Sequence, residues 1–456
     1  MLRETLKRNK GITLIALVVT IIVLLILAGI SISMLTGQNG ILTNASKAKN
    51  ETGEAQIEEK VKLSVGDALT RGTGTLEDEN LKSALNSYIG KDKYKITGDK
   101  EKGWTVQVIE NGKSYDISSM GKISKSLPKQ KGVTEPYLPS DDFEMDEGTS
   151  LDTGLVIKDS VGNEYVWVEV PKTSEVYPTA GTKITSFGTD EYSKIETDLH
   201  TYTKDYRNGT SYKDDYAPDT TTGWFTETGD KSYDTAKKKM LKSVYEHGGF
   251  WVGRYEAGIE KEADIRKAKT DTVTLTPVTK QNMYPYNYVT ITQAKVLAEK
   301  VESGNCTSSL MFGVQWDLVL KYIETKGNVK STDLTSNSTL KGNYDNNKWN
   351  IQNTKAKYSK DYGKSFTACP YKKTPNASIL ILLTTGADAS FSLMNIYDIA
   401  GNVAEWTLEN TSSAVNPCAY RGGSYNFNGS NFPARNRSSG LTSHSTNNIG
   451  FRLSLY

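Results

Sequence analysis

The residue types that most often carry out chemistry are sparse and scattered in this chain. Three cysteines lie tens of residues apart with no CxxC pair: Cys306, Cys369 and Cys418. One disulfide is compatible with this spacing, whereas a disulfide framework is not. The three histidines form no HExxH motif: His200, His247 and His444. A zinc or iron site built on imidazole is therefore not expected.

Other catalytic patterns are also missing from the sequence. It contains no GxSxG, no P-loop and no GxGxxG motif behind a strand. The acidic pair Asp141-Asp142 lies in a polar, proline-containing stretch, where a solvated surface is the expected role.

A binding face is a better candidate, near the carboxy terminus. Residues 425–448 read YNFNGSNFPARNRSSGLTSHSTNN and mix aromatic residues with Asn and Ser. Rigid aromatic anchors beside adaptable hydrogen-bonding groups are typical of binding surfaces. The alternative is a loop that is polar only because it is exposed. The candidate ligand-binding residues are Tyr425, Asn426, Phe427, Asn428, Asn431, Phe432, Asn436, Ser443 and His444.

Length and composition indicate a globular protein of two or three domains. The chain has 456 residues, 37% hydrophobic and 24% charged, which is ordinary for folded proteins. Its formal net charge of +2 leaves no electrostatic footprint for nucleic acid.

The amino-terminal segment predicts a single membrane span. Ile12 to Leu35 are 24 residues without a charge, and a helix of that length is about 36 Å long, against about 30 Å for a bilayer core. Four basic residues precede it: Arg3, Lys7, Arg8 and Lys10. The positive-inside rule then keeps the leader in the cytoplasm and sends the remaining chain outward.

The junction before this segment resembles the prepilin-peptidase site of type IV pilins and pseudopilins. It reads Lys10-Gly11 followed by Ile12, Thr13, Leu14 and Ile15. The resemblance implies cleavage between Gly11 and Ile12 by a prepilin peptidase, so that one helix serves as export signal and then as anchor or polymer core. The family's usual Glu at the fifth mature position is Ala16 here, which favours a minor or tip component among other pilins over ordinary polymerisation. A plain uncleaved anchor is the alternative.

Residues 36–125 fit a pilin-like domain. Ile57, Val61, Val65 and Leu69 recur every four residues, which predicts an amphipathic helix over about 44–69. Asn111-Gly112 between alternating runs predicts a hairpin. We expect a long helix packed on a small antiparallel sheet, followed by a semi-rigid linker over 126–144.

Residues 145–456 are expected to form a large, loop-rich domain. GLVIKDSVGNEYVWVEV predicts a hairpin with Gly162-Asn163 at its turn, and GGFWVGRYEAGI predicts another strand. Helical patterns cover 235–247, 291–303 and 314–325. The fold class expected for the whole chain is α+β.

Three ordered blocks at the end of the chain resemble the sulfatase-modifying-factor family. They are NIYDIAGNVAEWT, RGGSY and NIGFRLSLY, with weaker support from FWVGRYEAG and SLMFGVQWDLV. This is the fold of formylglycine-generating enzymes, a variant of the C-type lectin fold, and the resemblance covers roughly 145–456.

The resemblance carries two expectations about chemistry. Oxidising members use two cysteines just after RGGS, and the aligned positions here are Phe427 and Phe432, so we expect no catalytic activity. The family's calcium loop maps onto Asp398, the carbonyls of Gly401 and Val403, and Glu405, which implies a structural calcium ion. The alternative is that Asp398 caps a turn and Glu405 pairs with an arginine such as Arg421 or Arg452.

Proteins diversified by retroelements often use this lectin-like fold and vary the region after RGGS. The combined expectation is a surface-displayed, non-catalytic receptor or adhesin that is a single-pass membrane precursor and extracellular when mature. Its ligand would be an extracellular protein or glycan. A structural pilin subunit and a divergent enzyme of the sulfatase-modifying type are the alternatives.

Overall fold

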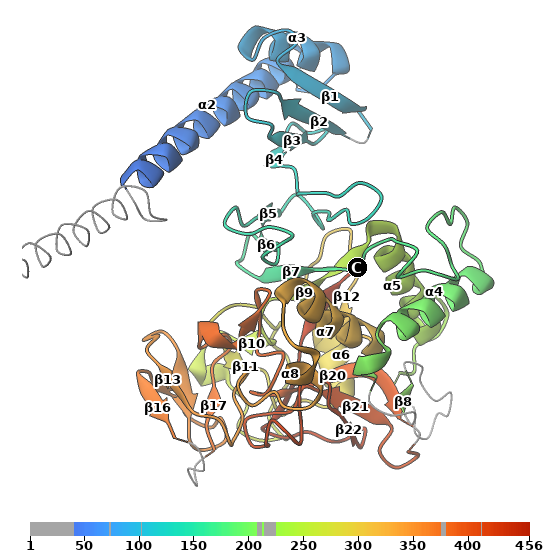
Figure 1. Ribbon diagram of the computed structural model, residues 1–456, viewed down its shortest axis with the longest axis vertical. Helices are drawn as coiled ribbons and strands as arrows, with labels where there is room; N and C mark the ends of the chain where they lie inside the picture. The colour runs from blue at the N-terminus through green and yellow to red at the C-terminus, as the bar shows by residue number, and fades with distance from the viewer. Residues whose placement is uncertain are drawn as a thin grey trace, which may run out of the picture. The chain divides into compact units, whose positions relative to one another are not determined.

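The chain forms two units, each with a core of its own, Met1–Ser126 and Leu127–Tyr456 (Figure 1). The computed structural model describes residues 41–456 apart from residues 73, 102, 208–211, 214–224, 375–379 and 412. The predicted leader, the Gly11–Ile12 cleavage site and the hydrophobic segment 12–35 lie outside the described residues. Within the described ranges, no helix combines the length and apolar character needed to cross a membrane.

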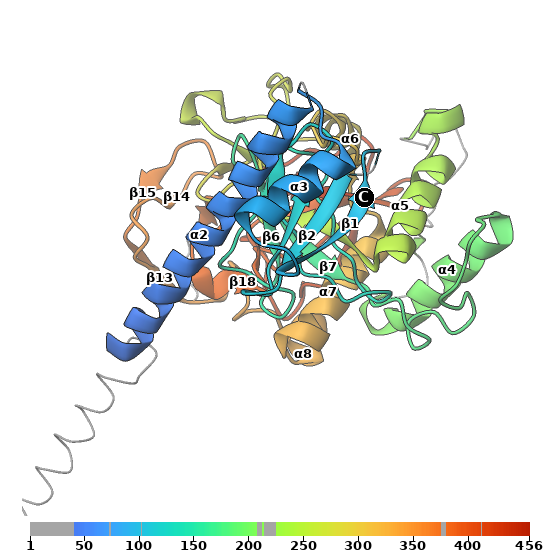
Figure 2. The same cartoon turned by 90° about the horizontal axis from the view of Figure 1, so that it is seen from above.

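The first unit packs two helices on a four-stranded antiparallel sheet of order β1-β2-β3-β4. Figure 2 shows both helices lying across one face of this sheet. The elements are α2 (Ile41–Arg71), α3 (Asp78–Tyr88), β1 (Tyr94–Asp99), β2 (Gly103–Val108), β3 (Ser114–Ile117) and β4 (Ile123–Lys125). The expected helix and the hairpin between β2 and β3 are confirmed. The pilin-like character of this unit stays a prediction.

A stripe along α2 holds this unit together. Ile57, Val61, Val65 and Ala68 are buried against strand residues such as Trp104. Their spacing of three to four residues places them on one helix face, so burial there stabilises both helix and sheet. Leu69, predicted as the fourth member, is only partly buried because Ala68 takes the inner position.

Residues 127–144 of the expected linker 126–144 belong to the second unit. Leu127 and Phe143 are buried in that unit's core, and the Trp167 indole donates to Thr134 Oγ1 at 2.8 Å. Phe143 also begins β5 (Phe143–Met145) at the edge of the main sheet. The polar, proline-containing composition of this segment predicted a linker, but Leu127 and Phe143 anchor the segment in the core of the second unit.

The main sheet of the second unit has six strands in the order β12-β24-β9-β7-β6-β5, with antiparallel neighbours. The further strands are β6 (Val156–Asp159), β7 (Glu164–Glu169), β9 (Gly249–Gly253), β12 (Ser308–Leu310) and β24 (Leu453–Leu455). The hairpin predicted at Gly162-Asn163 is confirmed as β6–β7. Because β24 lies between β12 and β9, the end of the chain is built into the core.

A second sheet carries the carboxy-terminal blocks, in the order β22-β21-β20-β23, with β8 (Tyr212–Lys213) also paired to β20. Its strands are β20 (Ala404–Thr411), β21 (Cys418–Arg421), β22 (Arg437–Gly440) and β23 (Ile449–Phe451). Strand β23 runs parallel to β20, whereas β21 and β22 are antiparallel neighbours. Figure 1 shows β20, β21 and β22 side by side in orange and red.

The helices predicted from periodicity are present, and one of them connects the two sheets. They are α5 (Tyr233–His247), α6 (Ile291–Glu299) and α7 (Gly313–Gly327). The unit also contains α4 (Thr189–Tyr202) and α8 (Ser331–Thr335). Helix α7 contacts both β7 and β20. Short strand pairs complete the unit: β10 (Gly258–Ile259) with β11 (Tyr284–Pro285), β13 (Trp349–Ile351) with β16 (Tyr371–Lys373), β14 (Lys357–Ser359) with β15 (Thr367–Ala368) and β17 (Leu382–Leu383), and β18 (Ser392–Leu393) with β19 (Ile396–Tyr397).

Candidate binding surface

Two loops of the second sheet hold the predicted ligand-binding residues. Loop 422–436 joins β21 to β22, and loop 441–448 joins β22 to β23. Both loops therefore begin and end on strands of one sheet. A rigid scaffold beneath exposed loops is the usual architecture of a binding site.

The first loop opens with two glycines that no other residue could replace without strain. Gly422 and Gly423 have φ of 91° and 71°. A Cβ on Gly423 would lie 2.3 Å from the Phe432 carbonyl oxygen and 2.9 Å from the Tyr344 ring. The backbone at RGGS thus turns where only glycine fits, and it brings residue 423 against residue 432.

A buried network of four charges holds both ends of this loop. Arg421, at the end of β21, contacts Asp317 at 2.6 Å and Glu409 at 3.1 Å. Arg437, at the start of β22, contacts the same two carboxylates at 2.8 and 2.6 Å. All four side chains are fully buried. Two fully buried guanidinium groups match two carboxylates, which is the condition under which buried charges are tolerated. A third arginine, the partly exposed Arg207, lies 3.7 Å from Asp317 at the edge of this network.

Arg421 also fixes the backbone of loop 422–436. Arg421 Nε donates to the carbonyl oxygen of Asn436 at 3.1 Å, and the indole of Trp316 donates to that of Ala434 at 3.0 Å. Trp316 and Asp317 are neighbours on α7, so this helix positions residues 433–437 directly. Burial lowers the pKa of Arg421, opposed by the nearby carboxylates.

Phe427 and Phe432 form the aromatic centre of the first loop. Their rings stack with centroids 4.3 Å apart and an interplanar angle of 22°, and both residues are half-buried. Stacked aromatic side chains that remain partly accessible suit the role of an anchor for a ligand.

Tyr425 is a correction to the predicted surface, because it is fully buried. Its hydroxyl donates to Asn447 Oδ1 at 3.0 Å, which ties the first loop to the second. Asn426 serves a similar purpose, since its Oδ1 accepts from Ser424 Oγ at 2.6 Å and from Asn448 Nδ2 at 3.2 Å. These two residues support the surface from below and between the loops.

The remaining predicted residues form two groups. Asn428 and Asn431 lie within the first loop, whereas Asn436, Ser443 and His444 lie close to the two ends of β22. Asn428 Oδ1 accepts from the Ser430 backbone N–H at 2.9 Å, and Asn431 is exposed beside it. Asn436 Oδ1 accepts from Ser438 Oγ at 2.8 Å, and Ser443 is exposed. His444 stacks on Tyr420 with centroids 6.0 Å apart, and burial lowers the pKa of its imidazole. Tyr420 belongs to this second group, and no sequence motif had marked it.

The predicted calcium loop is held by the protein's own groups. Asp398 Oδ2 accepts from the Gly386 N–H at 2.7 Å, and Glu405 pairs with Arg452, whose Nη2 is 2.7 Å from Oε1 and whose Nε is 3.1 Å from Oε2. The backbone N–H groups of Gly401 and Val403, as distinct from the carbonyl oxygens expected as ligands, donate to the Gly422 carbonyl and to Glu256, respectively. Burial raises the pKa of Asp398 to about 7 and that of Glu256 well above its usual range.

This arrangement does not fit the calcium ion that the resemblance implied. A guanidinium against both oxygens of Glu405 would repel a cation on the same carboxylate. The pairing with an arginine, left open by the sequence, is the one observed. In the described part of the chain, no group of three or more His, Cys, Asp or Glu residues could hold a metal ion.

The three cysteines are unpaired thiols with raised pKa values. Burial raises the pKa of Cys306 and of Cys369 to about 11, and that of Cys418 to about 12. Cys418 is fully buried, as expected for a structural thiol. Such thiols hold little thiolate at neutral pH, which disfavours nucleophilic or redox chemistry.

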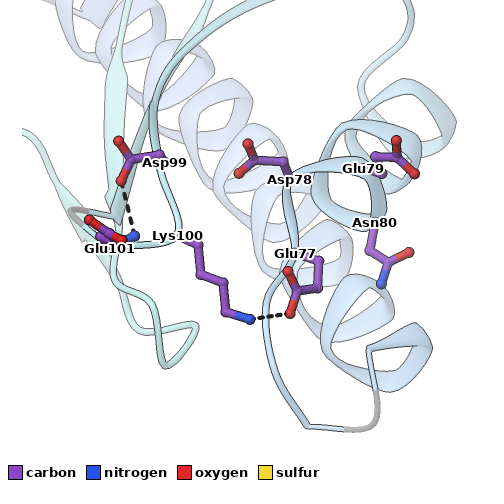
Figure 3. Close-up of a pocket in the computed structure, with 7 residues that line it drawn as sticks. All are labelled: Glu77, Asp78, Glu79, Asn80, Asp99, Lys100 and Glu101. Carbon is purple, nitrogen blue, oxygen red and sulfur yellow. Dashed lines mark hydrogen bonds and ion pairs between the residues drawn. The ribbon is translucent and has the colours of Figure 1, made fainter.

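A hollow in the first unit is lined mostly by carboxylates, as Figure 3 shows. Three of its residues, Glu77, Asp78 and Glu79, surround the start of α3, where a helix dipole favours negative charge. Asp78 accepts from the Trp104 indole at 2.7 Å, and Lys100 pairs with Glu77. Folding of the unit accounts for these contacts, so the hollow is not a candidate site.

A hollow in the second unit lies around Arg254. Its guanidinium stands 5.7 Å from the ring centroids of both Tyr255 and Tyr397 and donates to Glu164 at 2.7 Å. The aromatic faces and a carboxylate of this hollow are therefore already occupied by an internal cation.

Comparison with known proteins identifies one domain class. Residues 261–455 match the family model described as "Sulfatase-modifying factor enzyme 1-like domain". The matched residues lie in the second unit and include both loops and, except for Tyr456, the three carboxy-terminal blocks. No curated protein sequence matches the chain.

Two solved structures show a distant similarity. One is the crystal structure of CarF, with 12% identity, a TM-score of 0.29 and coverage of 45% of this chain and 85% of that chain. The other is Treponema denticola variable protein 1, with 16% identity, a TM-score of 0.28 and coverage of 45% and 84%. TM-scores of this size do not by themselves establish a shared fold.

Proposed function

We propose that this protein binds a ligand outside the cell through loops 422–436 and 441–448, and that it does no chemistry on that ligand. The observation that carries the proposal is the stacked, half-buried pair Phe427–Phe432. These residues stand at the positions that align with the two cysteines of oxidising relatives. An aromatic pair there can anchor a ligand, but it can neither bind a metal nor exchange thiols.

The rest of the site supports binding over catalysis. The buried pair of arginines and carboxylates, together with Trp316, holds both ends of the loop through the protein's own contacts. Pre-organisation of this kind reduces the entropy lost on association. The raised pKa values of the three cysteines leave no thiol suited to redox catalysis near neutral pH.

The mode of display belongs to the same proposal. The uncharged segment 12–35 behind a basic leader supports a single-pass precursor, cleaved between Gly11 and Ile12 by a prepilin peptidase. The mature protein would then sit at the cell surface or within a pilus among other pilins. Intact-mass measurement of the exported protein tests this step, because a mature chain beginning at Ile12 supports it and one beginning at Met1 contradicts it.

Diversification by a retroelement is a further part of the proposal, for the loop region only. Sequencing of the gene's surroundings tests it, since an adenine-rich template repeat beside a reverse-transcriptase gene is expected. A locus with neither the template repeat nor the reverse-transcriptase gene contradicts this part of the proposal and leaves the binding function unaffected.

The binding function is tested with full-length protein, purified in detergent and applied to arrays of cell-surface ectodomains and glycans. A Phe427→Ala/Phe432→Ala double variant is compared with Val161→Ala, a substitution of an exposed apolar residue in the β6–β7 turn. We expect at least one specific ligand that the double variant loses and Val161→Ala retains. Binding that persists in the double variant contradicts the proposed site.

A further inference from the structure

Two tyrosines outside the predicted loops hold an unusual backbone conformation next to the binding surface. Tyr288 and Tyr362 have φ of 55° and 64°, in the left-handed region that bulky side chains rarely adopt. Such conformations persist only where the surrounding structure enforces them, and they cluster at functional sites.

Both residues are held firmly in place. The Tyr288 N–H donates to the Thr446 carbonyl at 2.9 Å, and the neighbouring Asn287 side chain donates to the Asn447 carbonyl at 2.7 Å. Tyr362 lies in a loop organised by Asp361, whose carboxylate accepts from Ser359 Oγ at 2.7 Å and from the Ser365 backbone and side chain at 3.0 and 2.6 Å. Tyr362 nevertheless leaves 47% of its surface exposed.

The two tyrosines lie beside the described loops. A Cβ on Gly363 would be 3.2 Å from Asn287 Nδ2, so the Tyr362 loop touches the segment that carries Tyr288. Tyr288 and Tyr362 are both close enough to Tyr425 to add to the effect of burial in raising its pKa. Asn447 accepts from Tyr425, and Asn448 bonds to Asn426, the residue before Phe427. Tyr362 and Tyr288 therefore lie next to the two loops, one of which carries Phe427 and Phe432.

The chemistry of this surface indicates its partner. Residues 422–434 and 281–294 contain no charged side chain, and the only His, Lys, Arg, Asp or Glu in 438–450 is His444. Charges occur at the edge of the surface, where Lys360, Asp361 and Lys364 flank Tyr362. Depletion of charge with enrichment of aromatic residues characterises the buried centre of protein–protein interfaces. The side-chain oxygens of Asn426, Asn428, Asn447 and Asn448 already accept hydrogen bonds within the unit. Fewer acceptors therefore remain for the hydroxyl groups of a sugar.

We propose that Tyr288 and Tyr362 extend the binding surface, and that the combined face, Tyr288, Tyr362, Phe427 and Phe432, binds an uncharged region of a folded protein partner. This inference rests on the proposed function and goes beyond it in two respects, the additional residues and the class of ligand.

The test uses full-length protein in detergent against an array of purified cell-surface ectodomains and a parallel array of neutral and anionic glycans. Tyr362→Gly removes the ring and also relieves the left-handed strain, so the variant should fold at least as well as the parent protein. Tyr88→Ala is the control, because Tyr88 is 40% exposed but lies in the first unit. Thermal unfolding of each variant verifies that it is folded.

We expect Tyr362→Gly to weaken binding to a specific ectodomain at least about tenfold, and Tyr88→Ala to leave it unchanged. Affinity should change less than about threefold between about 50 and about 500 mM salt, because the centre of the face carries no charged side chain and the charges that flank Tyr362 are of both signs. Loss of binding in Phe427→Ala/Phe432→Ala with full retention in Tyr362→Gly overturns the inference and leaves the proposed function intact. Specific binding to glycans alone overturns the protein-partner assignment. No specific binding on either array overturns both proposals.

Discussion

Arg421 and Asp317 are 104 positions apart in the chain, yet their side chains meet with Nη2 and Oδ1 separated by 2.6 Å, both fully buried. Arg437 reaches the other oxygen of the same carboxylate at 2.8 Å. One aspartate on α7 therefore holds both strands that flank loop 422–436. The stability of the second unit and the shape of its binding surface depend on the same contact.

Replacement of Asp317 by Asn should destabilise the second unit strongly. The change leaves two buried guanidinium groups facing the single carboxylate of Glu409, and unpairing of buried charges costs about 3 to 5 kcal/mol. Chemical denaturation measures the loss. The control is Asp333→Asn, which removes a partly exposed pair with Lys341 and should cost about 1 kcal/mol or less. Equal effects of the two substitutions would contradict the role given to Asp317.

Gly423→Ala separates steric crowding from backbone strain when it is compared with Gly181→Ala. Both glycines have φ of 71°, but nothing lies within 4 Å of a Cβ on Gly181. Gly181→Ala should cost about 1 to 2 kcal/mol for the left-handed conformation alone. Gly423→Ala should cost about 2 kcal/mol more, because its Cβ overlaps the Phe432 carbonyl. Thermal and chemical unfolding measure both, and similar losses would show that residue 423 does not press against residue 432.

Lys373 should make the stability of the second unit depend on pH in the alkaline range. Burial lowers the pKa of its ammonium group from 10.5 to about 8, although Nζ contacts the Tyr344 carbonyl and, at 3.2 Å, Asn347 Oδ1. Between these two pKa values the unfolded chain binds the proton more readily than the folded one. The free energy of unfolding should therefore rise with pH from about 8 to about 10.5, by at most about 3 kcal/mol.

Lys373→Met should abolish that rise, and Lys372→Met, at the exposed neighbouring position, should preserve it. The measurement is chemical denaturation across this pH range. If the free energy of unfolding of Lys373→Met still rises over this pH range, groups other than Lys373 cause the rise.

The native thiols should react slowly with a disulfide reagent at pH 7.5. Their raised pKa values leave little thiolate, and Cys418 is fully buried. All three should react at once when the protein is unfolded in denaturant. Rapid reaction of Cys418 in the native protein would reopen the possibility of thiol chemistry.

Local patterns in the sequence predicted the fold well wherever a few neighbouring residues decide the structure. Asn111-Gly112 and Gly162-Asn163 mark hairpins because their turns need residues that accept unusual backbone angles, and both hairpins are present. Hydrophobic periodicity predicted α5, α6 and α7, because the apolar residues that each helix buries recur every three to four positions.

The site was less predictable because long-range contacts decide it. Tyr425 is buried, and its hydroxyl donates a hydrogen bond to Asn447, 22 positions later; nothing near Tyr425 in the sequence indicates this. The pairing of Glu405 with Arg452 likewise spans 47 positions. Tyr288 bonds to Thr446, and the Tyr362 loop touches Asn287; no local motif could have indicated either contact.

Hydrogen–deuterium exchange on the full-length protein tests the central claim most directly, with and without a saturating ectodomain or glycan from the arrays. We predict protection by the ligand at residues 424–434 and 446–448, with Val161 and its turn unchanged. Protection confined to the first unit, or to the hollow around Arg254, would contradict the account.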